Sequence, residues 1–310
     1  MDRSVVERLA GAAQGPGAEV VTGAELALLT TLRVGGPAAL MVTVDDEAAL
    51  LRTVRAATEQ VVPILVLGRG SNMLIADEGW PGLVLRLGRG FRGIRIDGSR
   101  VVTGGAEPMP SVAVRTAQAG LAGFAWGAAV PGSMGGGVRM NAGAHGADMA
   151  DSIVTARVLD ATTGVMEDWD AERLRLAYRS SALTPSSIVT EVTLELAAAE
   201  RVDVLAEIDA IRSWRRDHQP LDRPSCGSVF TNPPGASAGE LIERVGLKGT
   251  RIGGAEVSTT HANFIVTSAQ ARASDVEALI ELVAGRVLAE TGIELRAEVV
   301  RPSPSRSEER

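Results

Sequence analysis

The sequence has 310 residues, which suggests about two domains with room for a sizeable core. The formal net charge of −7 argues against nucleic acid as the main partner, although amides in a glycine-rich loop could still hold a phosphorylated ligand. The single cysteine, Cys226, excludes an intrachain disulfide, and a charged N-terminus without any membrane-length apolar run leads us to expect a soluble, cytoplasmic protein.

Apolar periodicity and turn residues predict the secondary structure in chain order. Helices are predicted near the N-terminus, after the caps Asp45 and Asp46, and over 110–119, 204–216, 238–245 and 274–292. Ser274 and Glu277 are expected to form the capping box of the last helix. Strands are predicted over 38–44, 61–67, 84–87, 93–96, 100–103, 153–159, 165–169, 188–196 and 293–299.

Three of these strands carry a more specific expectation. Residues 153–159 and 165–169 should form a hairpin, and the alternation over 188–196 is typical of a half-buried strand. In 293–299 the alternation places Glu298 on the face opposite the apolar residues. Residues 197–201 are predicted as a domain boundary, and 301–310 as a disordered tail.

The stretch 127–146 is rich in glycine and carries apolar residues between the glycines. A flexible linker would instead mix in serine and charge, so this alternative fits less well. Glycine at this density lets backbone approach a ligand closely and present its N–H groups. We therefore interpret the stretch as a ligand-binding turn.

A second glycine loop, 68–72, follows the predicted strand 61–67 and suggests a dinucleotide fingerprint. Gly68 and Gly70 fit its first two positions, but the third falls on Met73 and no helical pattern follows. A glycine-lysine-serine/threonine phosphate loop is absent as well, and no zinc spacing occurs, so no metal site is predicted. If these glycines bind pyrophosphate, they do so in another fold.

Nine motifs taken together resemble the UDP-N-acetylenolpyruvoylglucosamine reductase family, flavoenzymes of bacterial cell-wall precursor synthesis. They cover most of the chain in the family's order: TLRVGG (31–36), LGRGSN (67–72), VPGSMGGG (130–137), MNAGAHG (140–146), YRSS (178–181), GSVFTNP (227–233), GLKG (246–249), RIGGA (251–255) and AEV (297–299). The short spacing between Arg179 and Ser228 resembles the family branch that lacks an extra loop with a substrate-clamping tyrosine.

The resemblance implies an α+β fold in three parts. A two-subdomain FAD-binding fold of the vanillyl-alcohol-oxidase type would occupy 1–88 and 89–198, and a C-terminal α+β substrate domain 202–300. It implies non-covalent FAD, held by Gly68, Arg69, Gly70, Ser71, Asn72, Met73, Pro131, Gly132, Ser133, Gly136, Gly137 and Asn141. It also implies NADPH and UDP-N-acetylglucosamine enolpyruvate as small-molecule substrates, in a monomer or weak homo-oligomer without nucleic-acid or membrane partners.

The implied reaction assigns roles to individual residues. A hydride from NADPH passes by way of FAD to the methylene carbon of the enolpyruvyl ether, which leaves negative charge spread from the alpha carbon onto the carboxylate. By resemblance, Arg179 and Glu298 stabilise this charge and Ser228 supplies the proton. Glu298 is then expected to be protonated or paired with Arg179. Weaker candidates for substrate contacts are Tyr178, Asn232, Lys248 and Asn263.

Simpler readings exist for the same residues. Ser228 alone would be a turn residue, and Glu298 alone a solvated carboxylate. Two positions depart from the family pattern: Thr231 stands where a basic residue is common, and His145 where an aromatic residue is usual. The alternatives are a small-molecule oxidase on the same flavin fold and a non-catalytic UDP-sugar-binding flavoprotein. Retention of all three catalytic candidates disfavours the second of these.

Overall fold

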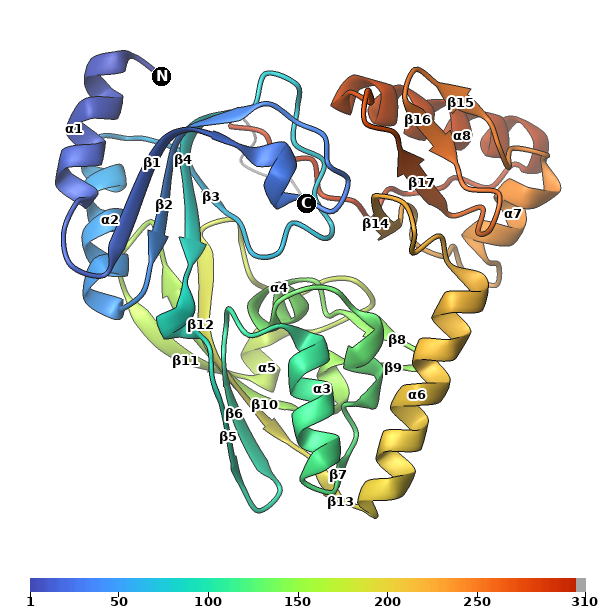
Figure 1. Ribbon diagram of the computed structural model, residues 1–310, viewed down its shortest axis with the longest axis horizontal. Helices are drawn as coiled ribbons and strands as arrows, with labels where there is room; N and C mark the ends of the chain where they lie inside the picture. Colours follow the sequence, from blue (N-terminus) through green and yellow to red (C-terminus); the bar gives the residue numbers. More distant parts are fainter. Residues whose placement is uncertain (305–310) are drawn as a thin grey trace. The chain divides into compact units, whose positions relative to one another are not determined.

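The computed structural model describes residues 1–304, and the chain divides into two compact units (Figure 1). Unit 1 contains Met1–Gly23, Ala39–Gly68 and Pro81–Trp214, and unit 2 contains Ala24–Ala38, Arg69–Trp80 and the chain from Arg215 onward. Each unit is therefore assembled from segments that are distant in sequence. The three-part division at 88, 198 and 202 stays a prediction, and residues 305–310 of the predicted tail lie outside the described residues.

The first sheet of unit 1 has the strand order β1-β2-β4-β3. The elements of this part are α1 (Arg3–Ala13), β1 (Ala18–Glu25), β2 (Pro37–Val44), α2 (Glu47–Glu59), β3 (Ile64–Val66) and β4 (Trp80–Leu87). The short 3-10 helix η1 (Leu26–Leu29) follows β1 in the chain but belongs to unit 2. The two α-helices pack against one face of the sheet, where Leu40 and Val42 meet Leu50 and Val54. As predicted, a capping aspartate begins α2: the Asp46 carboxylate accepts the Ala49 N–H at 2.7 Å.

The second sheet of unit 1 is antiparallel throughout, in the order β11-β10-β12-β6-β5. Its strands are β5 (Ile94–Asp97), β6 (Arg100–Gly104), β10 (Ile153–Asp160), β11 (Met166–Asp170) and β12 (Ser187–Glu195). The helices with it are η2 (Arg89–Phe91), α3 (Met109–Gln118), η3 (Ala125–Ala129), α4 (Met134–Arg139), η4 (Met149–Asp151), α5 (Ala171–Leu174) and α6 (Arg201–His218). Two small ribbons, β7 (Leu121–Ala122) with β13 (Ala197–Ala198) and β8 (Gly143–Ala144) with β9 (Ala147–Asp148), complete it.

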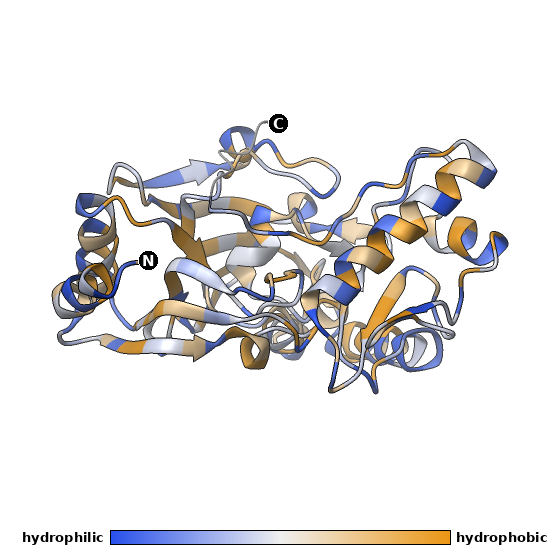
Figure 2. Cartoon of the chain, turned by 90° about the horizontal axis from the view of Figure 1, so that it is seen from above, coloured by the Kyte–Doolittle hydropathy of each residue, from blue (hydrophilic) through white to orange (hydrophobic). Residues whose placement is uncertain are grey.

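Unit 2 holds an antiparallel sheet in the order β14-β17-β16-β15. Its strands are β14 (Ser225–Ser228), β15 (Arg251–Ile252), β16 (Ala255–Val257) and β17 (Phe264–Thr267), and its helices are α7 (Ala238–Arg244) and α8 (Ala273–Thr291). Hydrophobic residues run along many of the strands, whereas the helices carry both hydrophobic and polar residues (Figure 2). The core of unit 2 includes Ile242 of α7, Ile280 of α8 and Val257 of β16.

Most predicted elements are present, and the hairpin is confirmed by the pairing of β10 with β11. The predicted strand 61–67 is reduced to β3, because Val61 has a φ of +53° and is 89 % exposed in the turn after α2. The expectation that 188–196 is half-buried is wrong. As the central strand, β12 gives Ile188 to the core shared with α2, and Val192 and Leu194 to the core shared with α3.

The predicted capping box of α8 is also wrong. The helix has Arg272 at its N-cap, so Ser274 already lies inside the first turn. The Ala273 and Ser274 N–H groups donate to the Asp77 carboxylate at 2.7 and 3.2 Å. Burial alone would raise the pKa of Asp77, but these hydrogen bonds and the charge of Arg272 outweigh it and lower the pKa. A residue far away in the sequence therefore caps α8.

Candidate active site

The two glycine loops predicted to hold the cofactor meet in unit 1. A Cβ atom built on Gly68 would lie only 2.7 Å from the Ser133 hydroxyl oxygen, so the loops approach each other where one residue has no side chain. Ser133 is the N-cap of α4, and its hydroxyl accepts a hydrogen bond from the Gly136 N–H at 3.4 Å. Sequence reasoning missed this helix, because consecutive glycines are poor helix formers.

The three consecutive glycines of α4 face different surroundings. A Cβ on Gly135 would lie 3.1 Å from a backbone oxygen of β12, and one on Gly137 would lie 2.8 Å from Met109 Sδ and 3.0 Å from Met149 Cε. Gly136 is exposed, and the nearest atom to a Cβ there is the neighbouring serine hydroxyl at 3.4 Å. Packing thus requires the two outer glycines, whereas Gly136 keeps its backbone accessible.

The rest of the loop 68–72, from Arg69 onward, belongs to unit 2. Gly70 has a φ of +60°, and a Cβ there would collide with the Leu29 carbonyl oxygen, so only glycine fits. Arg69 is exposed and Ser71 is half-buried. In the glycine-rich stretch 127–146, which lies in unit 1, Pro131 is exposed and Gly132 is half-buried. The Gly132 carbonyl accepts an N–H of α3.

Asn72, at the end of the loop 68–72, and the following Met73 lie beside the C-terminal segment that carries Glu298. The Asn72 side chain donates to the Glu298 carbonyl at 3.1 Å, and Met73 forms a parallel bridge with Val300. The predicted strand 293–299 is present only as isolated bridges, but its burial alternates as expected, with Leu295 buried and Glu298 half-buried. A predicted cofactor loop and a predicted catalytic residue are therefore neighbours in unit 2.

Ser228 lies next to the same segment. It ends β14, opposite Phe264 of β17, and Gly227 before it has a φ of +78° at a break in the strand register. The Glu298 N–H donates to the Val229 carbonyl at 2.7 Å. The fold of unit 2 therefore brings together two of the three predicted catalytic residues, Ser228 and Glu298.

Arg179 lies in unit 1, in a tight turn over 177–180 and with a φ of +54°. Its guanidinium donates to the carbonyls of Gly143 at 2.8 Å and Asn141 at 3.4 Å. The guanidinium carbon also lies 5.0 Å from the centre of the Tyr178 ring, which is 54 % exposed. The predicted catalytic arginine is thus tied to the end of the glycine-rich stretch.

Asn141 is 1 % exposed, and its side chain is used inside the protein. The amide nitrogen donates to Asp148 Oδ2 and to the Ala177 carbonyl, both at 3.0 Å, and the amide oxygen accepts the Ala150 N–H at 3.1 Å. Sequence reasoning assigned Asn141 to the cofactor and missed Asp148, because nothing in the local pattern links the two residues.

The predicted substrate residues other than Tyr178 make contacts within unit 2. The Asn232 side chain accepts the first N–H of α7 at 3.0 Å, and Lys248 Nζ lies 2.7 Å from Glu243 Oε1. The buried Asn263 side chain accepts the Phe230 N–H at 3.0 Å and donates to the Phe230 carbonyl at 2.8 Å. Asn263 therefore links its own backbone segment to that of Phe230. Substrate contacts by Asn232, Lys248 and Asn263 stay predictions.

The two departures from the family pattern have local partners. The Thr231 hydroxyl donates to the Arg296 carbonyl at 3.3 Å, a bond that needs no positive charge. His145, at the tip of the β8–β9 ribbon, packs edge-on against Trp214 with ring centres 5.1 Å apart. An aromatic contact is therefore retained at this position.

Two further titratable groups have shifted values. Burial raises the pKa of the Cys226 thiol to about 12, with a smaller contribution from the charge of Glu298, so the thiol stays protonated at neutral pH. Burial, and then the charge of Lys248, lowers the pKa of His261, which sequence reasoning did not single out. Cys226 is therefore not an activated nucleophile.

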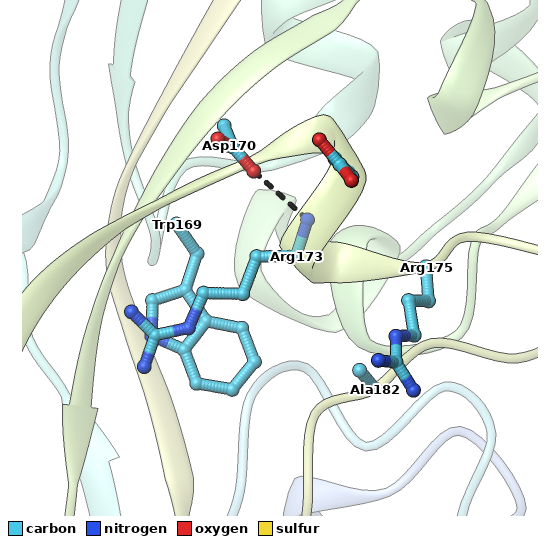
Figure 3. Close-up of a pocket in the computed structure, with 6 residues that line it drawn as sticks. Trp169, Asp170, Arg173, Arg175 and Ala182 are labelled. Carbon is cyan, nitrogen blue, oxygen red and sulfur yellow. Dashed lines mark hydrogen bonds between the residues drawn. The ribbon is translucent and has the colours of Figure 1, made fainter.

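Unit 1 also contains a pocket (Figure 3). It is lined by Trp169, Asp170, Glu172, Arg173, Arg175 and Ala182. The Arg173 guanidinium covers the Trp169 ring at 4.2 Å, and its backbone N–H donates to Asp170. Asp170 and Arg173 thus contact other residues of the protein, and no predicted site residue lines this pocket.

Residues 1–304 contain no cluster of acidic, histidine and cysteine side chains suited to a metal ion. Within the same range, no helix is both long and apolar enough to cross a membrane. Gly68 and Gly136 do fit a flavin dinucleotide, because both are exposed, lie near the Ser133 hydroxyl and carry no side chain that would keep a ligand from their backbone.

Comparisons with known proteins find relatives over most of the chain. Residues 38–168 match the FAD binding domain family, and residues 219–301 match the family described as UDP-N-acetylenolpyruvoylglucosamine reductase, C-terminal domain. The chain is 43 % identical over 296 residues to UDP-N-acetylenolpyruvoylglucosamine reductase 2 of Symbiobacterium thermophilum, covering 95 % of this chain and 96 % of the relative. It is 44 % identical over 272 residues to the corresponding reductase of Heliobacterium modesticaldum, covering 87 % and 86 %.

A solved structure is similar over nearly the same range. The crystal structure of UDP-N-acetylenolpyruvylglucosamine reductase from Thermus caldophilus superimposes with a TM-score of 0.79 at 39 % identity. The match covers 92 % of this chain and 98 % of that one.

Proposed function

The chain belongs to the UDP-N-acetylenolpyruvoylglucosamine reductase family, and from this premise we infer that it is the FAD-dependent oxidoreductase that its relatives are named for. It reduces UDP-N-acetylglucosamine enolpyruvate with NADPH, in peptidoglycan precursor synthesis. The motif-based prediction of family, fold class, cofactor and enzyme class is confirmed. The observation that carries the proposal is relatedness along nearly the whole chain, supported by the meeting of both predicted cofactor loops at Gly68 and Ser133.

We propose that the exposed backbone of Gly68 and Gly136, next to the buried N-cap Ser133, holds the FAD diphosphate. Backbone N–H groups can contact an anion closely only where side chains are absent, and the two glycines meet that condition. When bound, FAD supplies the hydride that NADPH delivers. The predicted division into 1–88, 89–198 and 202–300 belongs to the same proposal, with the first two parts holding the cofactor.

We propose that Arg179 and Glu298 stabilise the negative charge that develops on the substrate carboxylate, and that Ser228 protonates the alpha carbon. Two carbonyl contacts fix the guanidinium of Arg179, so it can act as a preorganised cation. Gly227 at φ +78° and the pairing of Val229 with Glu298 hold Ser228 beside the acidic residue. The charge state of Glu298, protonated or paired with Arg179, remains part of this proposal.

Secondary parts of the proposal concern binding and assembly. Asn232, Lys248, Asn263 and Tyr178 are proposed to contact the substrate diphosphate or sugar. The Lys248 ammonium would then exchange Glu243, its partner at 2.7 Å, for a phosphate. We also propose a cytoplasmic monomer or weak homo-oligomer, which sedimentation at several concentrations would check.

The purified protein mixed anaerobically with NADPH and then with substrate tests the function. We expect a yellow protein whose flavin band bleaches with NADPH and returns on adding UDP-N-acetylglucosamine enolpyruvate, with product heavier by two hydrogens. A colourless protein that cannot be reconstituted with FAD would refute the proposal. Return of the band with oxygen but not with the enolpyruvyl substrate would instead identify an oxidase.

A further inference from the structure

We propose that Asn141 positions the catalytic Arg179 and does not contact the cofactor. The inference rests on the proposed role of Arg179, but it concerns a different residue and a different kind of contact. It replaces the assignment of Asn141 to the cofactor that the motif MNAGAHG suggested.

The side chain of Asn141 is committed to three bonds within unit 1. It is 1 % exposed, donates to Asp148 and to the Ala177 carbonyl, and accepts the Ala150 N–H. A primary amide has two N–H donors and one carbonyl oxygen, so both donors are occupied. A cofactor contact through either N–H would break one of these buried bonds, which is costly.

Asn141 contacts the arginine turn at two separate points. Its side-chain amide donates to the carbonyl of Ala177, the first residue of the turn. Its backbone carbonyl accepts a hydrogen bond from the Arg179 guanidinium at 3.4 Å. The second guanidinium bond goes to the Gly143 carbonyl at 2.8 Å, on the segment that Asn141 begins. One buried residue therefore orients both the backbone and the side chain of Arg179.

Backbone conformation explains why an asparagine suits this position. Asn141 has a φ of +40°, a region that most side chains avoid but that asparagine tolerates. Asp148 holds the far side of the amide and is itself fixed, because its N–H donates to Asp151 and its carboxylate accepts the Ala150 N–H. Asn141 combines a left-handed backbone with donors aimed at Ala177 and Asp148.

Glycine substitutions separate the side chain from the backbone at these positions. Asn141→Gly and Arg179→Gly each remove a side chain where φ is positive, so neither adds backbone strain. Val61→Gly, at another left-handed position that is 89 % exposed, controls for the added freedom of the unfolded chain. Each holoenzyme is assayed separately for FAD affinity, flavin reduction by NADPH and turnover of the enolpyruvyl substrate.

We expect Asn141→Gly to keep the FAD dissociation constant within about threefold of the parent and to slow substrate reduction by about tenfold to a hundredfold. In the Arg179→Gly background it should slow the reaction less than about twofold further, because it acts through the arginine. Val61→Gly should match the parent in every measurement. Weaker FAD binding of Asn141→Gly with unchanged substrate reduction would overturn the proposal. So would a double variant whose rate is lowered by the full product of the two single-variant effects.

Asn141→Asp adds a readout that a general loss of packing would not move. The new carboxylate would face Asp148, at the end of β9; Asp151 of η4 accepts the Asp148 N–H, and the Arg179 guanidinium donates to the backbone carbonyl of residue 141. Only its protonated form can donate to Asp148 or to Ala177. Substrate reduction should therefore recover towards the parent rate as the pH falls, whereas Asn141→Gly should show no such recovery. Equal pH profiles of the two variants would count against the proposal.

A double-mutant cycle for stability, measured on the FAD-free protein, keeps this inference separate from the proposed function. Urea unfolding of the parent, both single glycine variants and the double variant measures the coupling between Asn141 and Arg179 without any turnover. Coupling of the two residues supports positioning even if the parent fails to reduce the enolpyruvyl substrate. Additive effects in the FAD-free protein would refute it even if the enzyme is active.

Discussion

Valine substitutions at two adjacent glycines, Gly136 and Gly137, should have opposite consequences. A side chain at Gly136 enters accessible space, with only the Ser133 hydroxyl at 3.4 Å from its Cβ. A side chain at Gly137 enters the core, 2.8 Å from Met109 Sδ and 3.0 Å from Met149 Cε. Gly136→Val should therefore impair FAD binding, and Gly137→Val should impair folding.

The magnitudes follow from these contacts. Valine is a few tenths of a kcal/mol better than glycine in a helix, so FAD-free Gly136→Val should be about as stable as the parent. Overpacking against a bound ligand costs about 1–3 kcal/mol, which corresponds to an FAD dissociation constant raised by about 5- to 150-fold. At Gly137 the same cost falls on folding, because Met109 and Met149 are completely buried and must move.

Two measurements on each variant decide the outcome. Urea unfolding of the FAD-free protein gives the free energy of unfolding, and titration with FAD followed by flavin fluorescence gives the dissociation constant. Parent-like FAD binding by a folded Gly136→Val protein would show that this loop does not hold the cofactor. If Gly137→Val is as stable as the parent, Met109 and Met149 move aside without lowering the free energy of unfolding, which would refute the packing argument.

Four further outcomes are expected. Ser228→Ala should bleach with NADPH at the parent rate but reduce substrate about 10²- to 10⁴-fold more slowly in anaerobic stopped-flow; a parent rate would make Ser228 a turn residue only. Asp77→Ala should lose about 1 kcal/mol of unfolding free energy at neutral pH. Burial alone would raise the pKa of Asp77, but its hydrogen bonds lower it. The stability difference between parent and variant, measured by urea unfolding, should therefore vanish as the pH falls through the pKa of Asp77 in the folded protein. A difference that persists below this pKa would contradict the capping role. Iodoacetamide should leave native Cys226 unmodified near pH 8 and alkylate it in urea, since burial raises the pKa of its thiol to about 12. Acid precipitation should release all FAD into the supernatant, because the loop from Gly68 to Asn72 offers no cysteine or histidine for a covalent bond.

The sequence alone determined what depends on local signals. Helices with clear periodicity and caps, such as α2 after Asp46, were predicted because a side chain and the amides that it caps are close in the chain. The alternation over 293–299 correctly placed Glu298 on the face opposite the buried Leu295 and Val299, even though no regular strand forms. Family and cofactor followed from nine ordered motifs, because loops that approach a ligand tolerate few residue types.

Only the tertiary structure decided questions in which distant segments compete for the same residue. Packing against Met109 and Met149, not a ligand, explains the absence of a side chain at Gly137. Asp77 caps a helix that begins at Ala273, a bond across 196 positions that no local pattern could indicate. Asn141 looked like a cofactor residue in its motif, but burial and the carbonyl of Ala177 commit its amide to the protein. In each case the sequence shows which groups can bond, and the fold determines which partner comes within reach.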